Sequence, residues 1–121
     1  MKPEVTVLIA DDHPLLRRGL RDVLAGNSRF KIVGEAPDGH EALRLLTSLR
    51  PQITIVDIDM PGMDGIETAR RLTSLYPCSI IFSTGLWDDK TLQRSREVHA
   101  ASYLVKPFSP AQLQAALQLS D

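Results

Sequence analysis

Three aspartates stand where apolar runs end, and no other pattern in the chain has as much potential for chemistry. Asp11 and Asp12 follow the run Val5–Ala10, and Asp57 closes the run Ile53–Asp57. Carboxylates that lie close together repel one another and titrate as a group. Mg²⁺ offsets such a charge, because it accepts one or two carboxylates and keeps room for water and phosphate oxygens. The three aspartates therefore predict a Mg²⁺ site if the fold brings the two runs together.

Five β-branched runs alternate with segments of helical period. The runs predict strands over Val5–Ala10, Phe30–Glu35, Ile53–Asp57, Ile80–Thr84 and Ser102–Val105. The alternation predicts an α/β fold, a flavodoxin-like doubly wound sheet of five parallel strands in the order 2-1-3-4-5 with five helices. Strands 1 and 3 are then neighbours at the switch point, and all three aspartates face one crevice.

Helix starts are also visible in the sequence. Cap-like pairs occur at Asp38 with Glu41 and at Asp64 with Glu67, and the last helix has Ser109, Pro110 and Gln112. Asp12 could likewise be only a helix cap, but one cap needs one carboxylate and three converge here. The weakest helical segment lies between Trp87 and Ala101, where Leu92 and Val98 are the strongly apolar positions.

Two further polar residues end the last two strands. Thr84 closes the fourth strand and Lys106 follows the fifth. A hydroxyl and an ammonium beside a carboxylate site supply donors for a phosphoryl group. Each residue alone could be an ordinary strand threonine or a surface lysine, but their joint placement at successive strand ends favours the functional interpretation.

Composition narrows the possible functions. With 121 residues, 43% apolar content and a net charge of -1, the chain fits one globular domain without a basic footprint for nucleic acid. Neither a signal region nor an apolar run of about 18 residues is visible, so we expect a cytoplasmic protein without a membrane contact. Cys78 is the single cysteine. It cannot form an internal disulfide, and we interpret it as a small packing residue.

Several motifs together resemble the receiver domain of two-component response regulators, in the NarL/FixJ (LuxR-type) branch. The resemblance covers residues 1–121 and rests on "IADDHPLLRRGL", "GEAPDGHEAL", "VDIDMPGMDGIE", Thr84-Gly85 and "YLVKPF". It implies that Asp57 accepts a phosphoryl group from the phosphohistidine of a sensor histidine kinase or a phosphotransfer protein. Sequence physics alone does not choose Asp57 over Asp12 as acceptor. The resemblance further implies Mg²⁺ bound by Asp11, Asp12, Asp57 and the backbone carbonyl of Asp59, with Lys106 on the phosphoryl group.

The same resemblance implies a conformational switch. Thr84 would be the switch hydroxyl and Tyr103 the aromatic that rotates inward with it. Because the connection from Asp57 to Thr84 is one residue shorter than usual in the family, Ser83 remains an alternative switch hydroxyl. Trp87 is either an exposed anchor for a partner or a ring lying over its own loop. A cis peptide is expected at Lys106-Pro107.

The resemblance favours a regulatory module that is not an enzyme. Such a module would form a homodimer on phosphorylation, and it would reach DNA only through a C-terminal helix-turn-helix domain that this chain does not contain. The alternative is a Mg²⁺-dependent haloacid-dehalogenase-like phosphohydrolase, because "IVDIDM" resembles its signature, with Asp57 as nucleophile and Asp59 as general acid/base. The following Met60 and Pro61, and the lack of room for a cap domain, argue against it. A third reading is a degenerate receiver that only binds partners, against which the intact acidic pair, acceptor and lysine argue.

Overall fold

A computed structural model describes residues 4–121 as five strands that alternate with five helices. The strands are β1 (Val5–Ala10), β2 (Phe30–Ala36), β3 (Ile53–Asp57), β4 (Ser79–Thr84) and β5 (Ser102–Val105). The helices are α1 (Pro14–Ala25), α2 (Gly39–Leu49), α3 (Gly65–Leu75), α4 (Asp89–Ser95) and α5 (Pro110–Ser120). All strand pairs are parallel and the order is β2-β1-β3-β4-β5. The predicted fold and strand order are confirmed, with β2 and β4 each one residue longer than expected.

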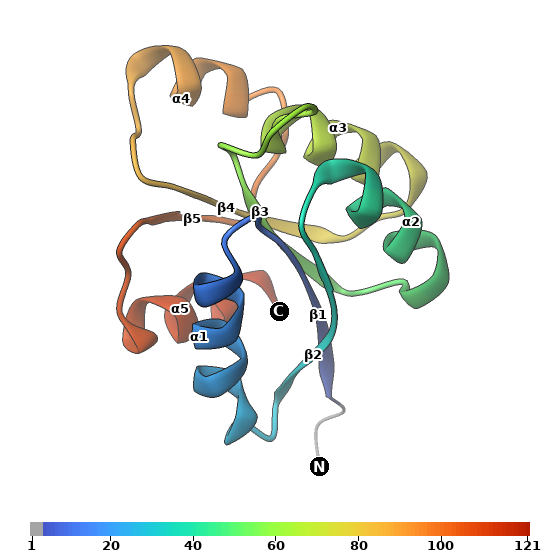
Figure 1. Cartoon of the computed structure of the whole chain (residues 1–121), viewed down its shortest axis with the longest axis vertical. Coiled ribbons are helices and arrows are strands. Elements are labelled where there is room, and N and C mark those ends of the chain that lie inside the picture. The colour runs from blue at the N-terminus through green and yellow to red at the C-terminus, as the bar shows by residue number, and fades with distance from the viewer. Residues whose placement is uncertain (1–3) are drawn as a thin grey trace.

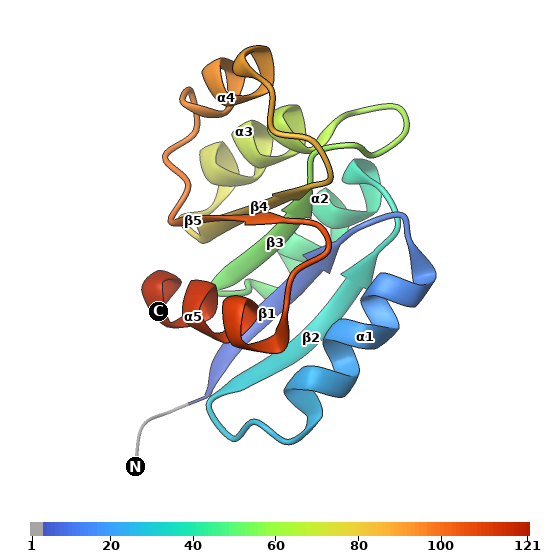
Figure 2. The same ribbon diagram turned by 90° about the vertical axis from the view of Figure 1, so that its left-hand side faces the viewer.

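The sheet separates two apolar layers. Helices α1 and α5 lie against one face, and α2 and α3 lie against the other (Figures 1 and 2). Adjacent strand residues point to opposite faces, so Ile55 packs with α1 and α5 whereas Val56 packs with α2 and α3. Burial on both faces explains why the central strands are apolar almost without interruption.

The predicted helix caps form. The Asp38 carboxylate accepts a hydrogen bond from the Glu41 backbone N–H at 2.8 Å, and the Asp64 carboxylate accepts one from the Glu67 N–H at 2.9 Å. Ser109 and Gln112 form a reciprocal capping box on α5. The N-cap of α1 is His13, whose side chain makes no capping bond. Capping therefore does not explain Asp12.

Helix α4 is as short as its sparse apolar residues suggested. It spans seven residues, and it is tied to the neighbouring helix by Arg94, which donates to the Asp64 carboxylate at 2.7 Å. A helix this short does not hold together on its own, so tertiary contacts must stabilise it.

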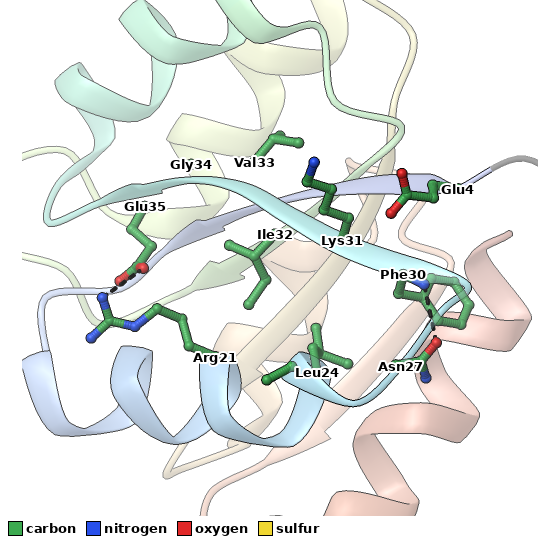
Figure 3. A pocket seen from close by; sticks show the side chains of 11 residues that line it. Glu4, Arg21, Leu24, Asn27, Phe30, Lys31, Ile32, Val33, Gly34 and Glu35 are labelled. Carbon is green, nitrogen blue, oxygen red and sulfur yellow. Dashed lines mark hydrogen bonds and ion pairs between the residues drawn. The ribbon is translucent and has the colours of Figure 1, made fainter.

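A groove lies between α1 and the edge strand β2 (Figure 3). Apolar side chains such as Leu24 and Ile32 line its floor, and an ion pair between Arg21 and Glu35, 3.2 Å long, closes one end. The three aspartates are not among its lining residues. The groove and the acidic crevice are therefore separate features.

A close backbone approach fixes the loop that joins β3 to α3. The Gly65 N–H donates to the Ile58 carbonyl at 3.0 Å, and a Cβ atom on Gly65 would lie 2.1 Å from the Asp57 carbonyl oxygen. Only glycine permits this approach, which places the start of α3 directly beside the end of β3.

We expect Gly65→Ala to destabilise the protein by at least about 2 kcal/mol, because backbone must move to admit the methyl group. Gly19→Ala is the matched control, since nothing lies within 4 Å of a Cβ in the middle of α1 and alanine favours helix by up to about 1 kcal/mol. Urea unfolding of both variants measures the difference. Equal stabilities would contradict the close-approach argument.

Candidate metal centre at the carboxyl edge of the sheet

The three aspartates meet at the carboxyl ends of β1 and β3. Because Ala10 pairs with Val56 in the sheet, the residues that follow β1 lie beside Asp57. One oxygen each from Asp11, Asp12 and Asp57 and a ring nitrogen of His13 all lie within 4.8 Å of one another. Asp57 is fully buried and Asp11 nearly so. The structure thus brings together the carboxylates that the sequence placed in one crevice.

Lys106 reaches into the same crevice. Its ammonium nitrogen lies 3.0 Å from Asp11 Oδ2 and 3.3 Å from Asp57 Oδ2. Its backbone N–H donates to the Thr84 carbonyl at 2.9 Å, and the Lys106-Pro107 peptide is cis, as expected. One lysine therefore bridges two of the three carboxylates.

His13 is a member of the cluster that sequence reasoning missed. Its Nδ1 atom lies 2.8 Å from Asp11 Oδ1, 3.1 Å from Asp12 Oδ1 and 3.6 Å from Asp57 Oδ2. The sequence did contain a signal for this contact: His13 directly follows the acidic pair, and Pro14 marks the first residue of the helix. An imidazole at the N-cap of α1 must lie close to the carboxylates that end β1.

The two oxygens of Asp57 have different surroundings. Oδ1 accepts a hydrogen bond from the Asp59 backbone N–H at 3.1 Å. Oδ2 is buried and accepts no directed hydrogen bond from residues 4–121, although the Lys106 ammonium is near. Burial raises the pKa of Asp57, with a smaller contribution from the Asp11 charge, while the Asp59 N–H and Lys106 act in the opposite direction. Asp57 is thus a buried carboxylate with one oxygen that has no hydrogen-bond partner among residues 4–121.

Two neighbouring hydroxyls end β4 and lie on opposite faces of the sheet. Ser83 is in register with Asp57, so their side chains lie on the same face, and its buried hydroxyl has no partner in the described part of the chain. Thr84 donates to Asp59 Oδ2 at 2.6 Å. This carboxylate contact was not foreseen, because Asp59 was expected to act through its carbonyl.

Thr84 shares its face of the sheet with the aromatic residues of β4 and β5. Phe82, two residues earlier, is in register with Tyr103, and their ring centroids are 6.1 Å apart. Tyr103 is 43% exposed. The Trp87 ring meets it edge-on at 5.1 Å and its Nε1–H donates to the Leu104 carbonyl at 3.4 Å. The Trp87 ring therefore packs on β5 of its own chain, which is closer to the second interpretation, a ring lying over its own loop, than to an exposed anchor.

Comparison with known proteins decides the family. The family profile described as response regulator receiver domain matches residues 7–118. The chain belongs to the response regulator receiver family. It is 39% identical over 114 residues to the transcriptional regulatory protein PdtaR of Mycobacterium tuberculosis, which covers 94% of this chain and 55% of PdtaR. It is 36% identical over 118 residues to the transcriptional regulatory protein LiaR of Bacillus subtilis, covering 97% of this chain and 56% of LiaR.

A solved structure supports the same conclusion. The signal receiver domain of the putative response regulator NarL from Mycobacterium tuberculosis superposes with a TM-score of 0.89 at 30% identity, and the match covers 98% of both chains. The predicted family and LuxR-type branch are thus confirmed, and this receiver domain functions in two-component signalling. The haloacid-dehalogenase alternative is not supported.

The family assignment bears on the acidic cluster. Receiver domains bind Mg²⁺ through acidic residues, and this chain has the acidic cluster that such a site requires.

The chain spans about half the length of PdtaR and LiaR. No helix within residues 4–121 is long and apolar enough to cross a membrane.

The burial of Asp57 has a measurable consequence for stability. A carboxyl whose pKa is raised by folding destabilises the protein above its folded pKa, and this cost disappears as the pH falls to the unfolded value of 3.8. We expect Asp57→Asn to unfold at a higher temperature than wild type at pH 7 in EDTA, with a gain that vanishes below pH 4. Because about 1 kcal/mol shifts the midpoint by roughly 4 °C in a domain of this size, calorimetry across pH can detect it.

Asp22→Asn is the matched control for this comparison, because it removes one exposed carboxylate from α1. A wild-type protein more stable than Asp57→Asn at pH 7 would show that Lys106 outweighs the cost of burial.

Proposed function

We propose that this receiver accepts a phosphoryl group on Asp57. One observation carries the assignment: Asp57 is fully buried, and its Oδ2 atom, at which no hydrogen-bond donor of residues 4–121 is directed, lies 3.3 Å from the Lys106 ammonium. Asp12, the alternative acceptor left open by the sequence, also has one buried oxygen without a hydrogen-bond partner among residues 4–121, but the residue is only half-buried. The Lys106 ammonium forms ion pairs with Asp11 and Asp57 and none with Asp12. A nucleophile needs a free lone pair held in place, and Asp57 meets that requirement.

The oxygen donors of the crevice fit Mg²⁺. Asp11, Asp12 and Asp57 would hold the ion, together with the backbone carbonyl of Asp59 as the family resemblance implies. When bound, the ion neutralises carboxylate charge and draws phosphoryl oxygens to the site. The unpartnered buried oxygen of Asp57 supports this fit, because a buried acceptor without a donor is stabilised by a cation.

The transfer step follows from these positions. Asp57 Oδ2 attacks the phosphorus of a phosphohistidine, the new P–O bond forms as the P–N bond breaks, and the partner's imidazole leaves with the bonding electrons. The product is an acyl phosphate on Asp57. Lys106 then binds a phosphoryl oxygen, since its ammonium already lies beside Asp57 Oδ2. Positioning and charge neutralisation provide most of the catalysis in such transfers.

Thr84 would report the phosphoryl group to the surface. In the structure its hydroxyl is held by Asp59 at 2.6 Å, so it must leave that carboxylate to donate to a phosphoryl oxygen. Movement of Thr84 frees space on its own face of the sheet, where Phe82 and Tyr103 pack. Tyr103 can then turn inward, and phosphorylation shifts an existing equilibrium between the two arrangements.

The partners follow from the family and from the relatives' names. A sensor histidine kinase or phosphotransfer protein supplies the phosphoryl group, and the chain acts as a cytoplasmic regulatory module rather than a turnover enzyme. PdtaR and LiaR are named transcriptional regulatory proteins, which supports a role in the control of transcription. Such control would act through a LuxR-type DNA-binding domain, as the family resemblance implies. Phosphorylation would promote a homodimer of receivers.

Intact-mass spectrometry after incubation with acetyl phosphate tests the assignment. We expect one phosphoryl adduct on the wild-type chain in the presence of Mg²⁺, and none in EDTA or in Asp57→Asn. Asp12→Asn should retain the acceptor but require a higher Mg²⁺ concentration to form the adduct. An adduct that persists in Asp57→Asn would overturn the assignment, and repeated release of phosphate from monoesters would indicate a hydrolase.

The fluorescence of Trp87, the single tryptophan, should report the switch, because its ring contacts Tyr103. We expect phosphorylation to change wild-type emission, and we expect Thr84→Ala to accept the phosphoryl group without that change. Ser83→Ala should behave like wild type in this readout, since the Ser83 side chain lies on the face of the sheet opposite to Thr84 and Tyr103. The reverse pattern in the two alanine variants would identify Ser83 as the switch hydroxyl.

A further inference from the structure

We propose that His13 makes the acidic crevice a binding site for borderline transition-metal ions, with Zn²⁺ as the representative, in addition to Mg²⁺. The ligands are Nδ1 of His13 and one carboxylate oxygen each from Asp11, Asp12 and Asp57. This inference rests on the cation site in the proposed function, but it does not require Asp57 to be phosphorylated.

The positions of the donor atoms carry the proposal. His13 Nδ1 is within 3.6 Å of one oxygen of each aspartate, and the four donor atoms lie within 4.8 Å of one another. One of them, Asp57 Oδ2, belongs to a fully buried side chain, faces the cluster and accepts no directed hydrogen bond from residues 4–121. An unsatisfied buried acceptor inside a set of metal ligands indicates a place for a cation.

The types of ligand determine which ions benefit from His13. Mg²⁺ requires near-octahedral oxygen ligands and keeps several waters, so the imidazole contributes little to it. Zn²⁺ binds imidazole and carboxylate in tetrahedral sites of four ligands, which is the number gathered here. Imidazole also suits copper, nickel and iron. His13 therefore discriminates between cation classes at one site.

The surroundings allow His13 to act as a ligand. Its side chain is 57% exposed and makes no capping bond with α1, so it can adjust without disturbing the core. Lys106 Nζ lies 3.5 Å from Nδ1 and would move aside, since it belongs to a long side chain near the surface. Three carboxylates are balanced by one divalent ion and Lys106, so the occupied site has no net charge.

Isothermal titration calorimetry of the metal-free chain with Zn²⁺ and with Mg²⁺ tests the proposal. We expect His13→Ala and His13→Gln to lose about tenfold or more in Zn²⁺ affinity, with no loss in Mg²⁺ affinity. His99→Ala is the matched control, because it removes an exposed histidine outside the cluster and should bind Zn²⁺ like wild type. Nitrogen NMR of the imidazoles adds a direct readout, in which the His13 Nδ1 resonance shifts on addition of Zn²⁺.

Each outcome of this experiment is decisive. Equal Zn²⁺ affinities in wild type and both His13 variants, or an unshifted Nδ1 resonance, would overturn the inference. If Mg²⁺ still bound in that case, the proposed function would be unaffected. Failure of wild type to bind either ion would instead refute the cation site on which both depend. A loss of Zn²⁺ affinity in His99→Ala equal to that in His13→Ala would place the ion elsewhere.

Discussion

The repulsion among three carboxylates held at the end of a buried sheet is the constraint to which the other features of this receiver respond. Two of the carboxylates, Asp11 and Asp57, have almost no contact with solvent, where unit charges a few ångströms apart interact much more strongly than in water. Lys106 lies against both, the Asp59 N–H binds one oxygen of Asp57, and His13 faces all three. The cluster is stabilised only in part, and it therefore attracts cations.

The apolar layers keep this unfavourable edge in place. Strands β1 and β3 are buried on both faces, so the residues that follow them cannot drift apart without opening the core. Gly65 contributes from the other side, because its contact with the Asp57 carbonyl brings the start of α3 against the end of β3. The chain thus uses the free energy of its core to maintain a site that is unfavourable by itself, a common relation between stability and function.

The features that could be predicted from the sequence are those that depend on the order and spacing of residue types. Strand order follows from the alternation of elements and the handedness of crossovers, so the meeting of Asp11, Asp12 and Asp57 could be inferred from the run ends alone. Caps such as Asp38 and Ser109 were predictable because a cap is decided within four residues. The weakness of α4 was visible in its two apolar positions.

The sequence could not predict what depends on side-chain conformation. The hydrogen bond from Thr84 to Asp59 joins the end of β4 to the loop between β3 and α3, through rotamers that no spacing rule determines. The contact of His13 with the aspartates could not be predicted, because it depends on α1 beginning at Pro14 rather than at Asp12. A difference of this size is within the usual uncertainty of helix ends. Ser83 and Thr84 are adjacent in the chain, and their opposite faces became distinguishable only through the register of β4.

The shortness of α4 also bears on how receivers diversify. Its seven residues connect the strand that carries Thr84 to the strand that carries Tyr103, and of its own residues only Ser95 is buried. Substitutions on this helix can therefore reshape the outer surface while both core layers and the acidic crevice stay unchanged. Lineages of this fold can acquire new recognition partners through a few exposed positions, and the chemistry of the crevice can be inherited intact.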